Sequence, residues 1–277
     1  GEITSVAPAG GSGLTVDVTT ATTLGKLILA QNIVGQVTTN STDAVNNVGY
    51  TIKQIGSPSS DISGFVSSTS PVEFSIGSGN SQLFVDSTTT SVVHDNKGYI
   101  IEADDVIYVS VRVLAGADGG ATSAQAGALV SKGASALGKT FRAGMFTNEN
   151  PQNNYLSFIY VMATENNTLV NFDDLPTGIL IKNYSGTLPI SNILLNEGES
   201  YVVAVNANDN TINRDALIGT LITSDKPIVV NTGSANGSFH NGGGRDYGID
   251  QIVGLDKVTV LNKTGADYIF VKGDGDD

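Results

Sequence analysis

The glycine-rich segment 233–254 holds the residue types best suited to bind a small polar ligand. Three successive glycines precede an arginine, an aspartate and a tyrosine, so the backbone can fold tightly against other groups. The candidate ligand-binding side chains are His240, Arg245, Asp246, Tyr247 and Asp250. Arg245 would supply bidentate donors and Tyr247 an aromatic face, a combination that suits a shallow ligand such as a glycan. The preferred alternative is structural, a large loop locked by an ion pair between Arg245 and a carboxylate.

Residues 133–140 match the phosphate-binding pattern GxxxxGK[ST] letter for letter. That pattern binds nucleotides only when the glycine loop leads into a helix whose N-terminus faces the phosphates. Here Gly144 and the pair Asn150 and Pro151 follow, and they leave no room for an ordinary helix. We therefore predict a glycine-containing hairpin turn rather than a nucleotide site.

Two arrangements of polar residues could support hydrolysis. Ser238, His240 and Asp246 have the residue types of a nucleophilic triad, but the sequence contains no GxSxG nucleophile elbow. His94, the other histidine, also lies in a loop-like segment and needs no catalytic role. A surface carbohydrate-active enzyme would instead need two carboxylates about 5 to 9.5 Å apart across a cleft. The candidates for such a pair are Asp173, Asp174, Asp246 and Asp250.

Acidic and amide side chains cluster at several places, and their oxygens are the ligands that calcium takes. The clusters lie at 104–105, 173–174, 206–210 and 274–277. None matches the D-x-[DN]-x-[DN]-G loop with its distal glutamate, and turn formation by Asp and Asn explains each cluster equally well. We assign no metal ligands and expect no cofactor, with a weakly bound calcium ion as the open alternative.

The composition is that of an acidic, cysteine-free protein with an uncharged polar surface. The 277 residues include 14 Lys and Arg against 27 Asp and Glu, a formal charge of -13. This charge repels phosphate backbones and anionic lipid, so we expect no nucleic-acid partner. No apolar run approaches the roughly 20 residues of a membrane helix, so membrane insertion is not expected. Charged residues make up only 15%, and the abundance of Ser, Thr, Asn and Gly is typical of extracellular β proteins.

Short runs of β-branched and aromatic residues, separated by turn residues, predict an all-β fold with few or no helices. Segment 106–114 alternates apolar and polar residues, as a half-buried antiparallel strand does. Comparable runs occur at 49–55, 98–103, 141–146, 155–162, 179–183, 201–206, 217–223, 228–231 and 268–271. The best helical window, 121–137, is interrupted by two glycines and is predicted as a strand over 125–131 followed by a turn. The spacing favours a β-sandwich or a propeller-like assembly.

The chain repeats part of its own sequence, which predicts a duplicated antiparallel β unit. The run that begins at Pro71 returns at Pro189, and the run that begins at Gly98 returns at Gly219. We expect the two units to share a core, with ligand-binding loops added to this scaffold. The predicted limits are 1–44 for an N-terminal arm or edge strands, 45–150 for the first β repeat, 151–272 for the second β repeat with the glycine-rich loop, and 273–277 for the start of an acidic linker.

Several stretches resemble the N-terminal domain of IgG-Fc-binding-protein type. They are 125–133, 141–148, 161–170, 219–233 and 244–253. The likeness spans about residues 45–272 and is closest to very long surface proteins of gliding Bacteroidetes. It implies an extracellular β domain at the N-terminal end of a long cell-surface adhesin, exported by type IX secretion and sometimes moved during gliding motility. Animal members carry cysteines around the matching Arg-Asp segment, and this chain has none, so antibody binding is not implied.

Together these features predict a non-enzymatic extracellular adhesin domain at the cell surface, without catalytic residues. Its expected partners are a glycan, a surface or a protein, besides the remainder of a long surface protein. One alternative is a structural subunit of a surface filament or layer, whose edge strands and apolar patches would be paired with neighbouring chains. A surface carbohydrate-active enzyme is the other alternative.

Overall fold

The structure is a computed structural model, and it describes ten ranges of the chain. These are 13–20, 27–29, 35–37, 48–67, 70–75, 82–104, 107–115, 125–144, 156–237 and 246–255. Within them the secondary structure consists of strands and short 3-10 helices without an α-helix, which confirms the all-β prediction. The predicted linker at 273–277 lies outside the described ranges.

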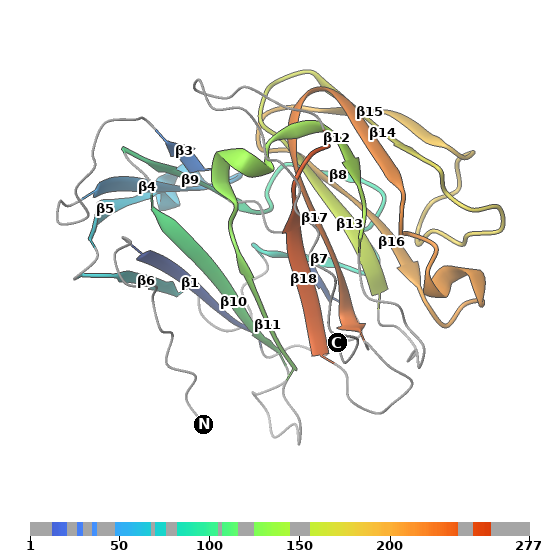
Figure 1. Cartoon of the computed structure of the whole chain (residues 1–277), viewed down its shortest axis with the longest axis horizontal. Helices are drawn as coiled ribbons and strands as arrows, with labels where there is room; N and C mark the ends of the chain where they lie inside the picture. Colours follow the sequence, from blue (N-terminus) through green and yellow to red (C-terminus); the bar gives the residue numbers. More distant parts are fainter. Residues whose placement is uncertain are drawn as a thin grey trace.

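The larger sheet has eight strands and is built around one long central strand (Figure 1). Its members are β8 (Val93–His94), β12 (Gly138–Arg142), β13 (Leu156–Ala163), β14 (Thr168–Asp173), β15 (Ile190–Leu195), β16 (Ser200–Asn206), β17 (Leu221–Gly237) and β18 (Asp246–Ile252). One edge of β17 pairs with β14 and then β13, and its other edge pairs with β12 and then β18. The sheet curls into a nearly closed barrel, in place of the predicted sandwich or propeller.

Three smaller sheets come from the N-terminal half of the chain and lie beside the barrel (Figure 1). The first contains β1 (Gly13–Thr20), β6 (Val72–Ser75), β10 (Tyr108–Ala115) and β11 (Gln125–Val130). The second contains β3 (Gly35–Val37), β4 (Val48–Gln54), β5 (Ile62–Val66) and β9 (Tyr99–Ala103), and the third contains β2 (Leu27–Leu29) and β7 (Phe84–Asp86). Most pairs are antiparallel, but β1 runs parallel to β10 and β6, and β3 runs parallel to β9.

Strands β13 and β16 are buried along their whole length on both faces. Because alternate residues of a strand point to opposite faces, each strand contributes to two separate hydrophobic clusters. On β13, Phe158 and Tyr160 belong to one cluster, whereas Ile159 and Val161 belong to the other. A continuous apolar sequence is what such a doubly covered strand requires.

We call the first cluster the shared core, because both halves of the chain build it. It includes Tyr50, Ile52, Phe84, Ile101, Val111, Leu129, Phe158, Tyr160, Met162, Val202 and Tyr247. The second cluster, the barrel core, is enclosed by the larger sheet. It includes Phe141, Ile159, Val161, Val170, Phe172, Ile190, Val203, Ile222 and Val230. Residues from both predicted β repeats, 45–150 and 151–272, therefore contribute to the shared core.

The internal sequence similarity does not correspond to a repeated sheet topology. Pro71 and Pro189 each directly precede a strand, but β6 pairs in parallel with β1 while β15 pairs antiparallel with β14. The copy that begins at Gly98 is divided between β9 and β10 in two different sheets, whereas the copy that begins at Gly219 lies within the single strand β17. Similar strand sequences thus occupy different surroundings.

The barrel closes along a seam between β16 and the loop that follows β14. An isolated bridge joins Ile181 to Val205, and the Lys182 amide donates to the Ala204 carbonyl at 2.8 Å. Asn213, just inside the 3-10 helix η4 (Ile212–Arg214), is fully buried at this seam. Its side-chain amide donates to the carbonyls of Leu180 and Asn206, and its side-chain oxygen accepts the Leu180 amide.

Residues 87–94, which we call the seam strap, cross the barrel from the N-terminal half. The Ser91 amide donates to the Val202 carbonyl at 2.9 Å, and the hydroxyls of Thr90 and Ser91 both donate to the Lys182 carbonyl. From the other side, the Asn183 amide donates to the Ser87 carbonyl. The strap therefore ties β16 to the loop that closes the barrel.

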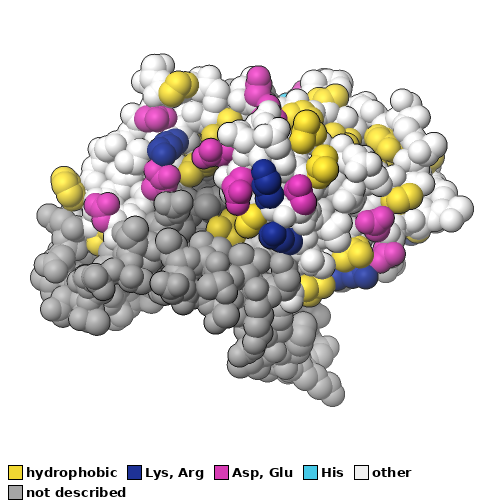
Figure 2. Space-filling view, turned by 90° about the horizontal axis from the view of Figure 1, so that it is seen from above, with side chains coloured by type: hydrophobic (Ala, Val, Ile, Leu, Met, Phe, Trp, Pro, Cys, Tyr) yellow, Lys and Arg dark blue, Asp and Glu magenta, His cyan; other side chains and the backbone are white. Residues whose placement is uncertain are grey.

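Figure 2 shows one face of the molecule, on which acidic side chains outnumber basic ones and lie among uncharged polar and scattered hydrophobic groups. In the described part of the chain, no helix has the length and apolar character needed to cross a membrane.

Replacing Gly233 by alanine is expected to destabilise the domain by about 2 to 3 kcal/mol, because overpacking forces neighbouring groups apart. A Cβ atom at Gly233 would lie 2.1 Å from the Gly248 carbonyl oxygen and 2.9 Å from Cζ of Phe158. Gly144→Ala is the matched control, since its Cβ would meet no atom within 4 Å. Urea unfolding should show a lower free energy for the first variant only, and equal stability of both variants would contradict this packing.

Asn213→Ala is expected to lower the free energy of unfolding by about 2 to 4 kcal/mol, because it leaves buried backbone groups of the seam without partners. The control is Asn96→Ala at an exposed turn, which should change stability by no more than about 0.5 kcal/mol. Thermal and urea denaturation of both variants would measure the difference. A change at Asn213 as small as that at Asn96 would show that the seam does not depend on this side chain.

Candidate functional site

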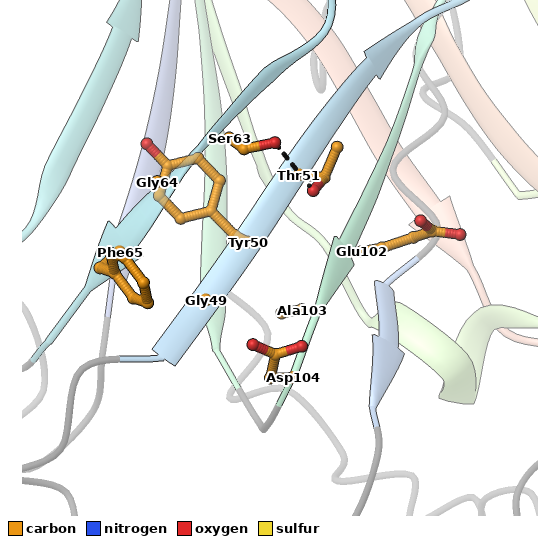
Figure 3. Close-up of a pocket in the computed structure, with 9 residues that line it drawn as sticks. All are labelled: Gly49, Tyr50, Thr51, Ser63, Gly64, Phe65, Glu102, Ala103 and Asp104. Carbon is orange, nitrogen blue, oxygen red and sulfur yellow. Dashed lines mark hydrogen bonds between the residues drawn. The ribbon is translucent and has the colours of Figure 1, made fainter.

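An open hollow of about 520 Å³ lies on the second N-terminal sheet, over strands β5, β4 and β9. It is lined by Gly49, Tyr50, Thr51, Ser63, Gly64, Phe65, Glu102, Ala103 and Asp104 (Figure 3). We call it the β4 hollow, after the strand that forms its floor. Its walls come from residues more than 50 positions apart in the sequence.

Strand alternation decides which side chains face the hollow and which face the core. On β4, Tyr50 and Ile52 point into the shared core, so Gly49 and Thr51 lie on the opposite face. Cross-strand register then places Phe65 of β5 beside Gly49 and Glu102 of β9 beside Thr51. The outer face of the sheet therefore carries an aromatic ring, hydroxyl groups and carboxylates together.

Glycine at position 49 makes room for the acidic side of the hollow. The Asp104 amide donates to the Gly49 carbonyl at 2.9 Å, which continues the pairing of β9 with β4. A Cβ atom at Gly49 would lie 2.2 Å from Oδ2 of Asp104, so the carboxylate lies over the bare backbone (Figure 3). On the opposite side, Phe65 is 68% exposed and forms an apolar wall.

The polar groups of the hollow are mostly hydrogen-bond acceptors. The hydroxyls of Thr51 and Ser63 are bonded to each other at 3.1 Å. Glu102 forms an ion pair with Lys53 at 2.6 Å, at the edge of the hollow. No Lys, Arg, His, Asn or Gln is among the nine lining residues. Such a surface can accept hydrogen bonds from a ligand while an aromatic face covers its apolar part.

The structure describes only some of the residues predicted to bind a ligand in the glycine-rich segment. His240 and Arg245 lie outside the described residues, and Asp246 begins β18 opposite Gly237. Tyr247 is 5% exposed and packs in the shared core against Phe158, with ring centroids 6.5 Å apart. Its ring is therefore not available as an exposed stacking surface.

Asp250 is exposed on β18, where its carboxylate accepts a hydrogen bond from the Lys132 ammonium at 2.6 Å. The same ammonium donates to the Gln251 carbonyl, and the Gln251 side chain accepts the Lys132 amide. These contacts join β18 to the turn after β11. The described contacts of Asp250 are thus those of an ion pair that holds two strands together.

Of the carboxylates considered for sugar hydrolysis, Asp173 and Asp250 lie far apart along the sheet. Asp173 is in register with Leu221 and Asp250 with Thr232, eleven residues apart along β17. At roughly 3.3 Å per strand residue, this separation is on the order of 30 Å. Asp174 is engaged in an ion pair with Arg142 at 2.5 Å. Among the described residues, no group of three or more His, Asp or Glu side chains is placed to hold a metal ion.

His94 has a structural position in the seam strap. Its Nε2 lies 2.9 Å from the Thr89 carbonyl oxygen, and burial lowers the pKa of the imidazole below its ordinary value. Residues 133–140 form the 3-10 helix η3 (Gly133–Ala136) followed directly by β12, so no α-helix follows the GxxxxGK[ST] pattern. In place of the predicted hairpin turn, a short 3-10 helix lies at this position.

Apart from Asp104, which belongs to the acidic cluster considered for calcium, the residues of the β4 hollow were missed by the sequence analysis. The run Ile62 to Val66 contains a signal, because Phe65 falls on the polar side of a short strand next to a glycine. The partners of that side chain depend on the register between β5, β4 and β9, which no short sequence pattern reveals.

The barrel and its flanking sheets, with the open polar hollow on one of them, make up an all-β domain. A family model described as IgGFc binding protein matches residues 126–277, more than half of the chain. The chain therefore belongs to this family, which confirms the family resemblance, although the match begins at residue 126 rather than 45. It covers β12 to β18 but not the β4 hollow. No curated protein and no solved structure matches the chain.

Variants of β18 should distinguish core residues from surface residues. Tyr247→Ala is expected to cost about 3 to 5 kcal/mol of stability, because it removes a buried aromatic ring. Asp250→Asn is expected to cost no more than about 1 kcal/mol, since its side chain is 64% exposed and the ion pair is screened by water. Urea unfolding would measure both, and a small loss at Tyr247 would contradict its position in the shared core.

Proposed function

We propose that this chain is a non-enzymatic, adhesin-type binding domain that acts outside the cell. The observation that carries the proposal is membership of the IgGFc binding protein family, whose model covers every strand of the larger sheet except β8. The abundance of uncharged polar residues agrees with an extracellular location. The β4 hollow provides an accessible surface at which a ligand can be bound without a catalysed reaction.

The resemblance to long bacterial surface proteins leads to a more specific proposal for the parent protein and its location. We propose that the domain belongs to the N-terminal part of a cell-surface adhesin of Bacteroidetes, exported by type IX secretion and used in attachment or gliding. Its partners are then an extracellular glycan, a surface or a protein, together with the remainder of the long polypeptide. The family description names the Fc part of IgG, which makes Fc one ligand to test rather than the expected one.

A structural subunit of a filament or layer is the second candidate, and one observation favours it. Leu169 and Leu194 are directly paired across β14 and β15 and are 37% and 52% exposed. Strand β15 is the last strand at its end of the larger sheet. An apolar pair beside such a strand is a surface that a neighbouring chain could cover.

Binding assays with the purified chain test the first proposal. The expected outcome is retention on at least one member of a panel of immobilised glycans, abiotic surfaces and IgG Fc, above that of an unrelated β protein of similar charge. Retention no greater than that control across the whole panel would overturn the adhesin proposal.

Light scattering separates the second candidate from the first. A filament or layer subunit should form larger species as its concentration rises, and Leu194→Asp should suppress them by placing a charge on the exposed apolar pair. A monodisperse monomer at high concentration, with or without calcium, would contradict the structural-subunit candidate.

A further inference from the structure

We propose that the β4 hollow binds an arginine side chain presented by a partner protein. This inference rests on the proposed binding function and names the chemical class of its ligand. It concerns a part of the chain that lies before the family match, so the family description does not assign it.

The lining of the hollow has many hydrogen-bond acceptors and few donors. Its charged groups are the carboxylates of Glu102 and Asp104, and its lining contains no basic or amide side chain. The hydroxyls of Thr51 and Ser63 already bond to each other, which uses one of their two protons. A surface so poor in donors is complementary to a group that only donates. Guanidinium, with five N–H donors and no acceptor, is such a group.

The hollow has an aromatic ring on one side and a carboxylate on the other, an arrangement that suits a planar cation. Phe65 is 68% exposed at one side, and Asp104 lies over Gly49 on the other (Figure 3). A planar guanidinium can stack on an aromatic ring while its edge donates to carboxylates, and both interactions are stronger for arginine than for a hydrated ammonium. The two contacts together would fix the orientation of an arginine side chain.

The negative charge of the chain and of the hollow also favours a cationic ligand. The chain carries a formal charge of -13, which attracts basic partners over long range. At the edge of the hollow, the ammonium of Lys53 already lies 2.6 Å from Glu102, so this side accommodates a cationic donor beside a carboxylate. Asp104, which also interacts with other residues of the chain, adds a second carboxylate to the lining of the hollow (Figure 3).

A neutral sugar fits these observations less well. Each sugar hydroxyl both donates and accepts, so a sugar site normally offers donors such as amide or basic side chains next to an aromatic ring. The nine lining residues of the hollow offer hydroxyl donors only. The observations therefore favour a protein partner over a glycan at this position.

Titration of the purified, isotope-labelled chain with the short peptide acetyl-Gly-Arg-Gly-amide tests the proposal directly. We expect saturable shifts of the backbone amide signals of Gly49, Thr51 and Phe65. The matched peptide with citrulline, which has the same shape but no charge, should bind at least tenfold more weakly, and raising the salt concentration should weaken only the arginine peptide. Equal affinity of the two peptides would overturn the proposal.

Two variants with exposed side chains should retain the fold and lose the interaction. Phe65→Ala and Asp104→Asn are each expected to weaken the arginine peptide by about threefold to tenfold, a range typical of cation–π and exposed ionic contacts. The matched controls are Leu194→Ala, which removes an exposed apolar side chain from β15, and Glu165→Gln, which removes an exposed charge from the loop after β13. Both controls should bind as the unmodified chain does.

The outcomes separate this inference from the proposed function. Shifts of the hollow signals by a panel of methyl glycosides at concentrations where the arginine peptide gives none would overturn the arginine assignment and make the hollow a sugar site. Unchanged affinity of Phe65→Ala and Asp104→Asn for the peptide would overturn it as well. If these variants bind the arginine peptide with unchanged affinity while the chain still adheres to its panel ligand, the adhesin proposal stands while the arginine assignment fails.

Discussion

The structure depends on two strands, β13 and β16, that have no solvent-facing side. Every second residue of each strand enters the shared core and the residues between them enter the barrel core. A strand covered on both faces loses its hydrophobic contacts on one side if either neighbouring layer is removed. The barrel therefore needs the N-terminal sheets to cover its outer face, and those sheets need the barrel as the surface on which they pack. This mutual coverage explains why one hydrophobic cluster contains residues from Tyr50 to Ile249.

Local patterns predicted several of the strands but not their partners, and the strand predicted at 179–183 is an irregular segment with one isolated bridge. The strand over 125–131 and the apolar strand over 155–162 agree with β11 and β13 to within a few residues. Pairing of β1 with β10 joins positions nearly a hundred residues apart in parallel, and no turn signal links such segments. The internal similarity was also misleading about topology, because a short β-branched run fits many sheets and does not specify its neighbours.

Tyr247 shows why the candidate site could not be predicted in full. A tyrosine among glycines suggested an exposed ring, yet glycines also let a ring lie directly on a backbone. A Cβ atom at Gly127 would approach within 2.5 Å of Cδ1 of Tyr247, so the glycine on β11 creates the space that buries the ring. At the β4 hollow the same residue type has the opposite effect, since the bare backbone at Gly49 leaves a surface open. Whether glycine covers or uncovers an aromatic group depends on the strand opposite it.

The seam strap has a consequence for how this architecture could be inherited. Residues 87–94 bond to β16 and to the closing loop, yet they precede the family match by more than thirty positions. A gene segment copied from residue 126 onward would encode a barrel that lacks both the seam strap and the N-terminal sheets that cover its outer face. Recombination that transfers this fold between proteins should therefore include the upstream strands. Otherwise another stretch of chain must replace them and bind both β16 and the loop that closes the barrel.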